Sequence, residues 1–231
     1  MRTFVIGDIH GCYAELLDLL EKAGVTRYDH IISLGDIINR GPQSQETLRF
    51  FMGEAPRYSC ASTRAIIGNH EYKHVRAHQG ERPPTLSMLM ARWQIGTAYE
   101  QAVTFMESLP TYIDLPEAYL AHAYFEPGIA LGDQQARVLV GTQGATDYLQ
   151  QTYSKPWWTL YDGDKPLLVG HKDMSGRQTP FVYRDRVFGL DTGCVYGGRL
   201  TGLWLPDFTL VSVAARAPHW QQMQAALTPP Q

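Results

Sequence analysis

Three short apolar segments near the N-terminus each end at a glycine that is followed at once by polar side chains. The segments read "TFVIG", "HIISLG" and "TRAIIG", and directly after them come Asp8 and His10, Asp36, and Asn69. Uninterrupted β-branched and aromatic residues that stop at a glycine indicate short buried strands. In an open α/β sheet, binding sites lie just beyond the carboxyl ends of the strands. We therefore expect these side chains, far apart in sequence, to meet at one edge of a sheet.

The same arrangement recurs twice later in the chain. His122 follows the apolar segment "YLA", and His171 follows "LLVG". Pooled, the strand ends offer oxygen and imidazole ligands of the kind that manganese, iron and zinc accept. Six such side chains exceed what one catalytic ion takes from a protein while keeping a position for water, and they suit two ions that share a carboxylate. The candidate ligands are Asp8, His10, Asp36, Asn69, His122 and His171, and His70 is left over.

Each of these residues has a structural explanation when it is taken alone. A Gly-Asp pair after a strand is usually a turn or a helix cap, and Asn69 by itself would be a turn residue. A single histidine after a strand is more often a buried, hydrogen-bonded residue than a ligand. Here all five strand ends carry such residues, in a chain with only eight histidines. The coincidence favours one shared site over five independent turns.

The segments around these strands predict an α/β fold. "CYAELLDLLEKAG" places leucines on one helical stripe and ends at Gly24, and residues 45–52 predict a second helix. Alternating strands and helices are typical of a layered α/β core whose helices cover the sheet. Residues 72–110 predict a helical insertion, whereas the short segments after Val169, "PFVYRDRVFGLD" and "LTGLWLPDFTLVSVAA", predict a second, more antiparallel sheet. No linker divides the chain, so we expect a single domain over residues 1–231.

Composition and charge exclude several classes of protein. The 231 residues are 44% hydrophobic and 19% charged, which is ordinary for a globular protein. A formal net charge of −3 argues against a protein that coats a nucleic-acid backbone, so no extended nucleic-acid binding is expected. The three cysteines, Cys12, Cys60 and Cys194, form neither a metal-finger spacing nor a disulfide framework, which suits a reducing compartment. Without a signal-peptide pattern or an apolar run of membrane-spanning length, we expect a cytoplasmic protein with no membrane partner.

Three ordered blocks carry a resemblance to a known family. "GDIHG" at 7–11, "GDIINRG" at 35–41 and "GNHE" at 68–71 resemble the signature blocks of calcineurin-like metallophosphoesterases of the phosphoprotein-phosphatase type. The resemblance continues in "LAHAYFEPG", in the Gly-His pair at 170–171 and in "LDTGCVYGGRLTGL", so it spans nearly the whole chain. It implies a four-layer α/β/β/α sandwich with the helical insertion described above.

The resemblance also implies a role for each site residue. Asp8 and His10 would bind one divalent ion, Asn69, His122 and His171 would bind the other, and Asp36 would bridge the two. Manganese is the first expectation for both ions, with iron or zinc as alternatives. Arg40 would hold the phosphoryl oxygens, for which a guanidinium is well suited. His70 would protonate the leaving oxygen as the general acid, while a metal-bridging hydroxide attacks the phosphorus.

Two positions depart from the pattern of the protein phosphatases. Asn39 stands where those enzymes have an aspartate paired with the general-acid histidine. An asparagine is expected to accept a hydrogen bond from His70, but it cannot stabilise the imidazolium by charge. Nucleotide-cleaving relatives, such as the diadenosine tetraphosphatases, are looser at this position. The second departure is the basic residue that many members place before the last Gly-His pair. Lys155 is the candidate substitute, and because a lysine carries a point charge it would not bind phosphate oxygens in a bidentate manner.

These residues predict a two-metal phosphatase that hydrolyses phosphomonoesters, either phosphoserine and phosphothreonine in proteins or small phosphate esters. The alternative is a dinucleoside polyphosphate or nucleotide hydrolase, which Asn39 and the two later blocks favour. In either case the expected partner is a phosphorylated substrate. A third hypothesis, an inactive relative that binds phosphate or a partner protein, is disfavoured because every ligand position is filled. Trp157 and Trp158 predict either packing or a base-stacking platform, and Asp191 either supports the ligands or forms a turn.

Overall fold

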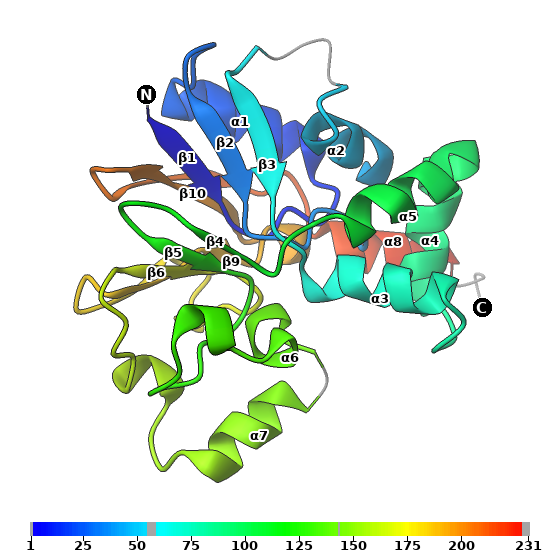
Figure 1. Cartoon of the computed structure of the whole chain (residues 1–231). Coiled ribbons are helices and arrows are strands. Elements are labelled where there is room, and N and C mark those ends of the chain that lie inside the picture. The colour runs from blue at the N-terminus through cyan, green and yellow to red at the C-terminus, as the bar shows by residue number, and fades with distance from the viewer. Residues whose placement is uncertain (1, 55–58, 143, 228–231) are drawn as a thin grey trace.

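The computed structural model describes residues 2–54, 59–142 and 144–227, and its strands form two sheets (Figure 1). The first sheet contains, in spatial order, β11 (Thr209–Ala214), β10 (Arg199–Leu205), β1 (Thr3–Ile6), β2 (His30–Ser33) and β3 (Ser62–Ala65), and β9 (Asp191–Thr192) pairs with β10. The second contains β4 (Tyr112–Asp114), β5 (Tyr119–Ala121), β6 (Leu167–Val169), β8 (Val187–Gly189) and β7 (Phe181–Tyr183).

Helices cover the outer face of each sheet. The first sheet carries α1 (Tyr13–Ala23) and α2 (Ser44–Phe51), and the second carries α6 (Ala136–Val140) and α7 (Ala145–Thr152), at opposite ends of the view in Figure 1. Helix α1 ends where the sequence predicts, because Gly24 adopts a left-handed conformation (φ 64°) and its N–H bonds to the carbonyl of Glu21. A last helix, α8 (His219–Leu227), lies near the C-terminus.

The four layers follow from the alternation of side chains along each strand. On β1, Phe4 and Ile6 join the apolar cluster that contains the residues of α1 and α2. Val5 points the other way and joins a cluster shared with Leu168 of β6, so this cluster lies between the two sheets. On β6, Leu167 belongs to the cluster formed with α6 and α7. The predicted α/β/β/α sandwich is confirmed.

The predicted composition of the second sheet is wrong in one respect. The segment "LTGLWLPDFTLVSVAA" forms β10 and β11, which belong to the first sheet, where Phe4 of β1 lies opposite Trp204 in an antiparallel pair. Strand β10 is buried on both faces, which suits a place inside the larger sheet next to β1. The second sheet is mixed, because β5, β6 and β8 run parallel and only the edge strands β4 and β7 are antiparallel.

The predicted helical insertion is present and begins earlier than expected. It consists of α3 (Asn69–His78), α4 (Leu86–Ile95) and α5 (Tyr99–Glu107), which lie together beside the sheets in Figure 1. Helix α3 starts at Asn69, inside the "GNHE" block, so the block supplies the first helical turn. Val103 and Met106 of α5 pack into the cluster shared with α1 and α2, which fixes the insertion to the body of the molecule.

Strand direction brings the polar segments to one edge, as predicted. Strands β1, β2 and β3 are parallel neighbours, with Ile6 opposite Ser33 and Ser33 opposite Ala65. The second sheet contributes the ends of β5 and β6, which are also parallel to each other. Within the described part of the chain, none of the helices has the length and apolar character needed to span a bilayer.

Candidate metal centre

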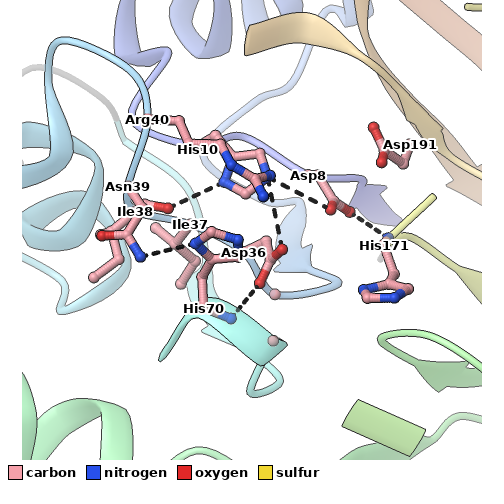
Figure 2. A network of polar contacts seen from close by, with 12 residues as sticks. Asp8, His10, Asp36, Ile37, Ile38, Asn39, Arg40, His70, His171 and Asp191 are labelled. Atoms are coloured by element: carbon pink, nitrogen blue, oxygen red, sulfur yellow. Dashed lines mark hydrogen bonds and ion pairs between the residues drawn. The ribbon is translucent and has the colours of Figure 1, made fainter. Parts of the chain in front are cut away.

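Four predicted ligands, Asp8, His10, His122 and His171, gather around the Asp36 carboxylate, and Figure 2 shows Asp8, His10 and His171 beside it. On one side, Nε2 of His10 lies 3.6 Å from Oδ2 of Asp36 and 4.0 Å from Oδ2 of Asp8. On the other side, Nε2 of His122 lies 3.5 Å from Oδ1 of Asp36. Ligand atoms of Asp36, His122 and His171 all lie within 4.8 Å of one another. Asp36 therefore belongs to both halves of the cluster, as a carboxylate shared by two ions must.

Four of the atoms that would bind metal have no hydrogen-bond partner within the described part of the chain. Among the described residues, only six buried side-chain nitrogen and oxygen atoms lack a hydrogen bond, and four are Oδ2 of Asp8, Oδ1 of Asn69, Nε2 of His122 and Nδ1 of His171. Buried polar atoms are nearly always paired, so four orphans in one cluster need an explanation. Because each is a lone-pair donor from the predicted ligand set, the residues fit two divalent ions of the manganese, iron or zinc type.

Hydrogen bonds with the backbone orient these ligands. Nδ1 of His10 donates to the carbonyl of Ile38 (3.1 Å), and Nδ1 of His122 donates to the carbonyl of Leu34 (2.7 Å). Since a carbonyl only accepts, both rings are protonated at Nδ1 and present the lone pair of Nε2 to the cluster. Oδ1 of Asp8 accepts the backbone N–H of His171 (2.8 Å), which ties the end of β1 to the end of β6.

The electrostatics also favour bound cations. Burial lowers the pKa of His10 and of His171 to about 3 and that of His122 to about 4, so all three imidazoles are neutral at pH 7. Burial, together with the nearby carboxylate of Asp191, raises the pKa of Asp8 well above its usual range. Neutral imidazoles and crowded buried carboxylates are the state that a divalent ion stabilises.

The backbone around the cluster adopts conformations that are rare for residues with side chains. His10, Asp36, Arg40 and His171 have φ values of 51°, 48°, 69° and 70°. A left-handed backbone conformation destabilises the folded state by about 1–3 kcal/mol at a residue other than glycine. Such residues cluster at functional sites. Gly170 is required for a different reason, since a Cβ there would lie 2.1 Å from Oδ1 of Asp8.

Glu71 is a site residue to which the sequence assigns no role. Its Oε1 accepts the backbone N–H groups of Ile37 (2.9 Å) and Ile38 (3.2 Å), and its Oε2 accepts those of Asp36 (2.8 Å) and Gly68 (3.1 Å). One buried carboxylate thus holds the loop that carries the shared ligand. A signal was available, because a glutamate at the third position of a helix commonly caps its own N-terminus.

Arg40 and His70 lie on the same side of the cluster, near His10. A guanidinium nitrogen of Arg40 lies 3.0 Å from Nε2 of His10, and the rings of His10 and His70 are 4.8 Å apart edge to face. The backbone N–H of His70 donates to Oδ1 of Asp36 (2.8 Å), which fixes the first turn of α3 against the ligands. Nε2 of His70 is buried and has no hydrogen-bond partner among the residues that the structure describes.

The predicted direction of the hydrogen bond between Asn39 and His70 is wrong. Nδ2 of Asn39 lies 2.8 Å from Nδ1 of His70, so the amide donates to the ring (Figure 2). The amide oxygen instead accepts from Nε2 of His74, at 2.8 Å. His74, one helical turn after His70, is a partner of the amide oxygen that the sequence does not single out.

A cavity of about 410 Å³ opens beside the second half of the cluster. Its wall includes Tyr124, whose ring packs edge to face against His171 at 5.2 Å. Lys155 and Lys172 also line it, so the structure places Lys155 at the cavity rather than against the ligands. Trp157 is buried and packs on Tyr124, as the packing interpretation predicts, whereas Trp158 is half-buried at the cavity.

Two further charged residues complete the surroundings. Lys73 is half-buried, and its charge adds to burial in lowering the pKa of His122 and of His171. It lies four residues after Asn69, on the same face of α3. A helix predicted from the "GNHE" block would therefore have placed Lys73 beside Asn69. Asp191 accepts the backbone N–H of Gly193 (2.9 Å), and burial raises its pKa to about 6. Its side chain thus closes a turn at the end of β9, and its carboxylate also acts on Asp8.

Residues 1–182 match the family model described as calcineurin-like phosphoesterase, so the chain belongs to the calcineurin-like phosphoesterase family and is a metal-dependent phosphoric ester hydrolase. The asymmetrical bis(5'-nucleosyl)-tetraphosphatase PrpE of Halalkalibacterium halodurans is 28% identical over 241 residues, which cover 94% of this chain and 96% of the relative. The symmetrical bis(5'-nucleosyl)-tetraphosphatase of Janthinobacterium sp. is 25% identical, covering 92% and 96%. A crystal structure of a candidate diadenosine tetraphosphatase has a TM-score of 0.75 and 26% identity, with 93% of each chain covered.

Proposed function

We propose that this enzyme hydrolyses dinucleoside polyphosphates at a phosphoanhydride bond. The proposal reverses the order that the sequence predicts, in which phosphomonoesters come first. The relatives described above support the reversal, because their names are those of dinucleoside tetraphosphatases and they match over nearly their whole length. The observation that carries the proposal is the aromatic cavity next to His171.

The cavity has the size and chemistry for one nucleoside of the substrate. Its volume of about 410 Å³ is in the range of small-molecule sites. Trp158 and Tyr153 offer aromatic faces for a base, and base–aromatic stacking contributes about 1–3 kcal/mol. Lys155 and Lys172 at the same cavity supply positive charge for the phosphates between the base and the ligand cluster.

The residues of the cluster have distinct tasks in this proposal. Two divalent ions, manganese by preference, would bind to the six predicted ligands and supply charge neutralisation and water activation. Arg40 would hold oxygens of the phosphoryl group under attack, and Lys73 would add a second positive charge. His70 would direct Nε2–H toward the leaving oxygen. Glu71 would keep Asp36 in place through the backbone of its loop.

A substrate panel tests the proposal. Manganese-loaded protein is assayed on diadenosine tetraphosphate, a phosphoserine peptide and 4-nitrophenyl phosphate, with a chelator-treated sample as the blank. We expect kcat/KM for the tetraphosphate to exceed the other two by at least about tenfold, since only it fills the cavity. A larger kcat/KM for the phosphopeptide would refute the substrate assignment.

Two additional measurements refine the result. Chromatography of the products reports the cleavage position, because central cleavage of the tetraphosphate gives two diphosphates and off-centre cleavage gives a monophosphate and a triphosphate. Elemental analysis of protein purified without added metal tests the expectation of two manganese ions per chain. Zinc or iron in a 2:1 ratio would keep the two-ion site and change its metal, whereas a single ion per chain would contradict the shared role of Asp36.

A further inference from the structure

A chain of buried hydrogen bonds runs from the helical insertion to His70. The Tyr99 hydroxyl of α5 lies 2.9 Å from Nδ1 of His74, and Nε2 of His74 lies 2.8 Å from Oδ1 of Asn39. Nδ2 of Asn39 then lies 2.8 Å from Nδ1 of His70. Asn39 and His74 are fully buried, and His70 and Tyr99 are nearly so. The chain joins α5, α3 and the loop after β2 at one point behind the ligand cluster.

The Asn39 amide turns its oxygen toward His74 and its nitrogen toward His70, and this placement sets where the protons lie along the chain. The oxygen of the Asn39 amide only accepts, so Nε2 of His74 must carry a proton. Burial, reinforced by the positive charge of Arg92, lowers the pKa of His74 to about 4, and the neutral ring accepts the Tyr99 O–H at Nδ1. At the other end the amide nitrogen only donates, so Nδ1 of His70 accepts and the proton of that ring is on Nε2.

The Nε2–H of His70 is the free end of this chain. That atom is buried and has no hydrogen-bond partner among the described residues. The ring also lies edge to face with His10, at 4.8 Å, so it borders the ligand cluster. A donor without an acceptor at this place is available to an oxygen of the substrate.

We propose that His74 and Tyr99 are positioning residues that fix the direction of the Asn39 amide, hold His70 as an Nε2–H donor, and so restrict the enzyme to leaving groups that depart as anions. The proposal deepens, and rests on, the proposed function. It names the leaving group as a phosphate of a phosphoanhydride rather than the alkoxide of a serine or threonine.

The balance of the reaction explains why the direction of one amide selects the leaving group. A P–O bond to water forms while the bridging P–O bond breaks, and the electron pair of that bond remains on the leaving oxygen. A phosphate ester has a pKa of about 6 and stays an anion, so one proton of the attacking water passes to solvent. An alkoxide is about as basic as hydroxide, so it must receive a proton as it leaves.

The hydrogen-bond chain supports only the first of these reactions. A neutral ring that accepts at Nδ1 stabilises an anionic oxygen through Nε2–H without giving up its proton. Full proton donation would need a second ring proton at Nδ1, which would then face the amide N–H of Asn39. An aspartate at this position would accept from Nδ1 and remove that conflict, because a carboxylate has no proton to donate.

Four variants separate positioning from simple packing. His74→Leu removes both hydrogen bonds of the ring, whereas His74→Gln keeps an N–H for Asn39 and an oxygen for Tyr99. Asn39→Asp reverses the direction of the bond to His70. His78→Leu is the matched control, because it makes the same change one turn later on α3 at an exposed residue.

The readout is the dependence of kcat/KM on the pKa of the leaving group, measured with a series of substituted phenyl phosphates. We expect a steep, equal dependence in wild type, His74→Gln and His78→Leu. In Asn39→Asp, phenyl phosphate should gain about 10²-fold relative to 4-nitrophenyl phosphate, within the range for a working general acid. His74→Leu should fall between, because its amide can turn either way. Equal slopes in wild type, His74→Leu and Asn39→Asp would overturn the proposal.

The tautomer of His70 provides a second test. It is measured on the wild-type protein, so it does not depend on whether a variant folds. Nitrogen-15 NMR of wild-type protein loaded with diamagnetic Zn²⁺ distinguishes protonated from bare ring nitrogens. We expect His70 to be bare at Nδ1 and protonated at Nε2, and a proton on Nδ1 would refute the inference. Neither test uses a dinucleotide, so protein that passes both yet ignores diadenosine tetraphosphate would contradict the proposed function alone.

Discussion

Replacing His74 by leucine should change how the stability of the protein depends on pH. Burial lowers the pKa of His74 from 6.5 to about 4 in the folded protein. The unfolded chain therefore binds a proton at this residue between pH 6.5 and pH 4, whereas the folded chain does not. Stability falls as pH falls wherever the unfolded state binds more protons, so His74 costs the wild type stability across this window.

The magnitude follows from the two pKa values. A difference of about 2.5 pKa units corresponds to about 3 kcal/mol once the pH is below 4, and about 2 kcal/mol of that is already lost at pH 5. Leucine has no proton to bind, so the His74→Leu variant escapes this loss. The difference in unfolding free energy between wild type and variant should thus shrink by about 2 kcal/mol between pH 8 and pH 5.

Urea unfolding at several pH values, with the same saturating metal in both proteins, measures the difference. A change of about 2 kcal/mol moves the midpoint by about 1 M urea, which is easily resolved. The metal ligands also titrate, but they contribute equally to both proteins and cancel. His78→Leu, which removes an exposed histidine paired with Glu100 at 3.5 Å, is the control for the loss of one histidine from α3. A difference that stays constant or widens toward pH 5 for His74→Leu would refute the reasoning.

Four other changes test the site directly. Asp36→Asn should lower bound metal from two ions to one or none by elemental analysis, because it weakens the ligand that both halves share; two retained ions would contradict that role. Glu71→Gln turns an N–H group toward two backbone donors and should destabilise the protein by about 2–5 kcal/mol in urea unfolding; a loss under 0.5 kcal/mol would refute the anchoring role. Trp158→Ala should raise KM for diadenosine tetraphosphate by about 5–100-fold and leave 4-nitrophenyl phosphate unaffected, with equal effects on both substrates counting against base stacking. Lys73→Met should raise KM for the tetraphosphate about tenfold with its metal content unchanged, and an unaltered KM would place this charge outside the phosphate site.

The ligand cluster could be predicted because its information is local in sequence. Each ligand directly follows a short apolar strand, and the parallel order of β1, β2 and β3 brings these ends together without any long-range detail. The assignment of each strand to one of the two sheets was harder to predict from the sequence. The apolar character of β10 indicates burial on both faces, but burial alone does not say which sheet holds the strand.

The residues that support the ligands form two groups: some are near the ligands in sequence, and others reach them only through packing. Lys73 lies four residues after Asn69 and His74 four residues after His70, while Glu71 is the third residue of the helix, so the "GNHE" block read as a first helical turn would have indicated all three. Tyr99 could not be found in this way, because it meets His74 only through the packing of α5 on α3. The direction of the Asn39 amide depends on that contact.

Asn39 shows how one substitution changes what the rest of a site must supply. An aspartate can orient a histidine by its charge, whichever groups lie behind it. An amide has one donor end and one acceptor end, so it orients His70 only if a second partner fixes which end faces the ring. His74 provides an N–H for the acceptor end, and its other ring nitrogen pairs with the Tyr99 hydroxyl. The helical insertion thereby contributes to the chemistry of the ligand cluster, since α3 and α5 must both be packed in place for His70 to present its proton to the substrate.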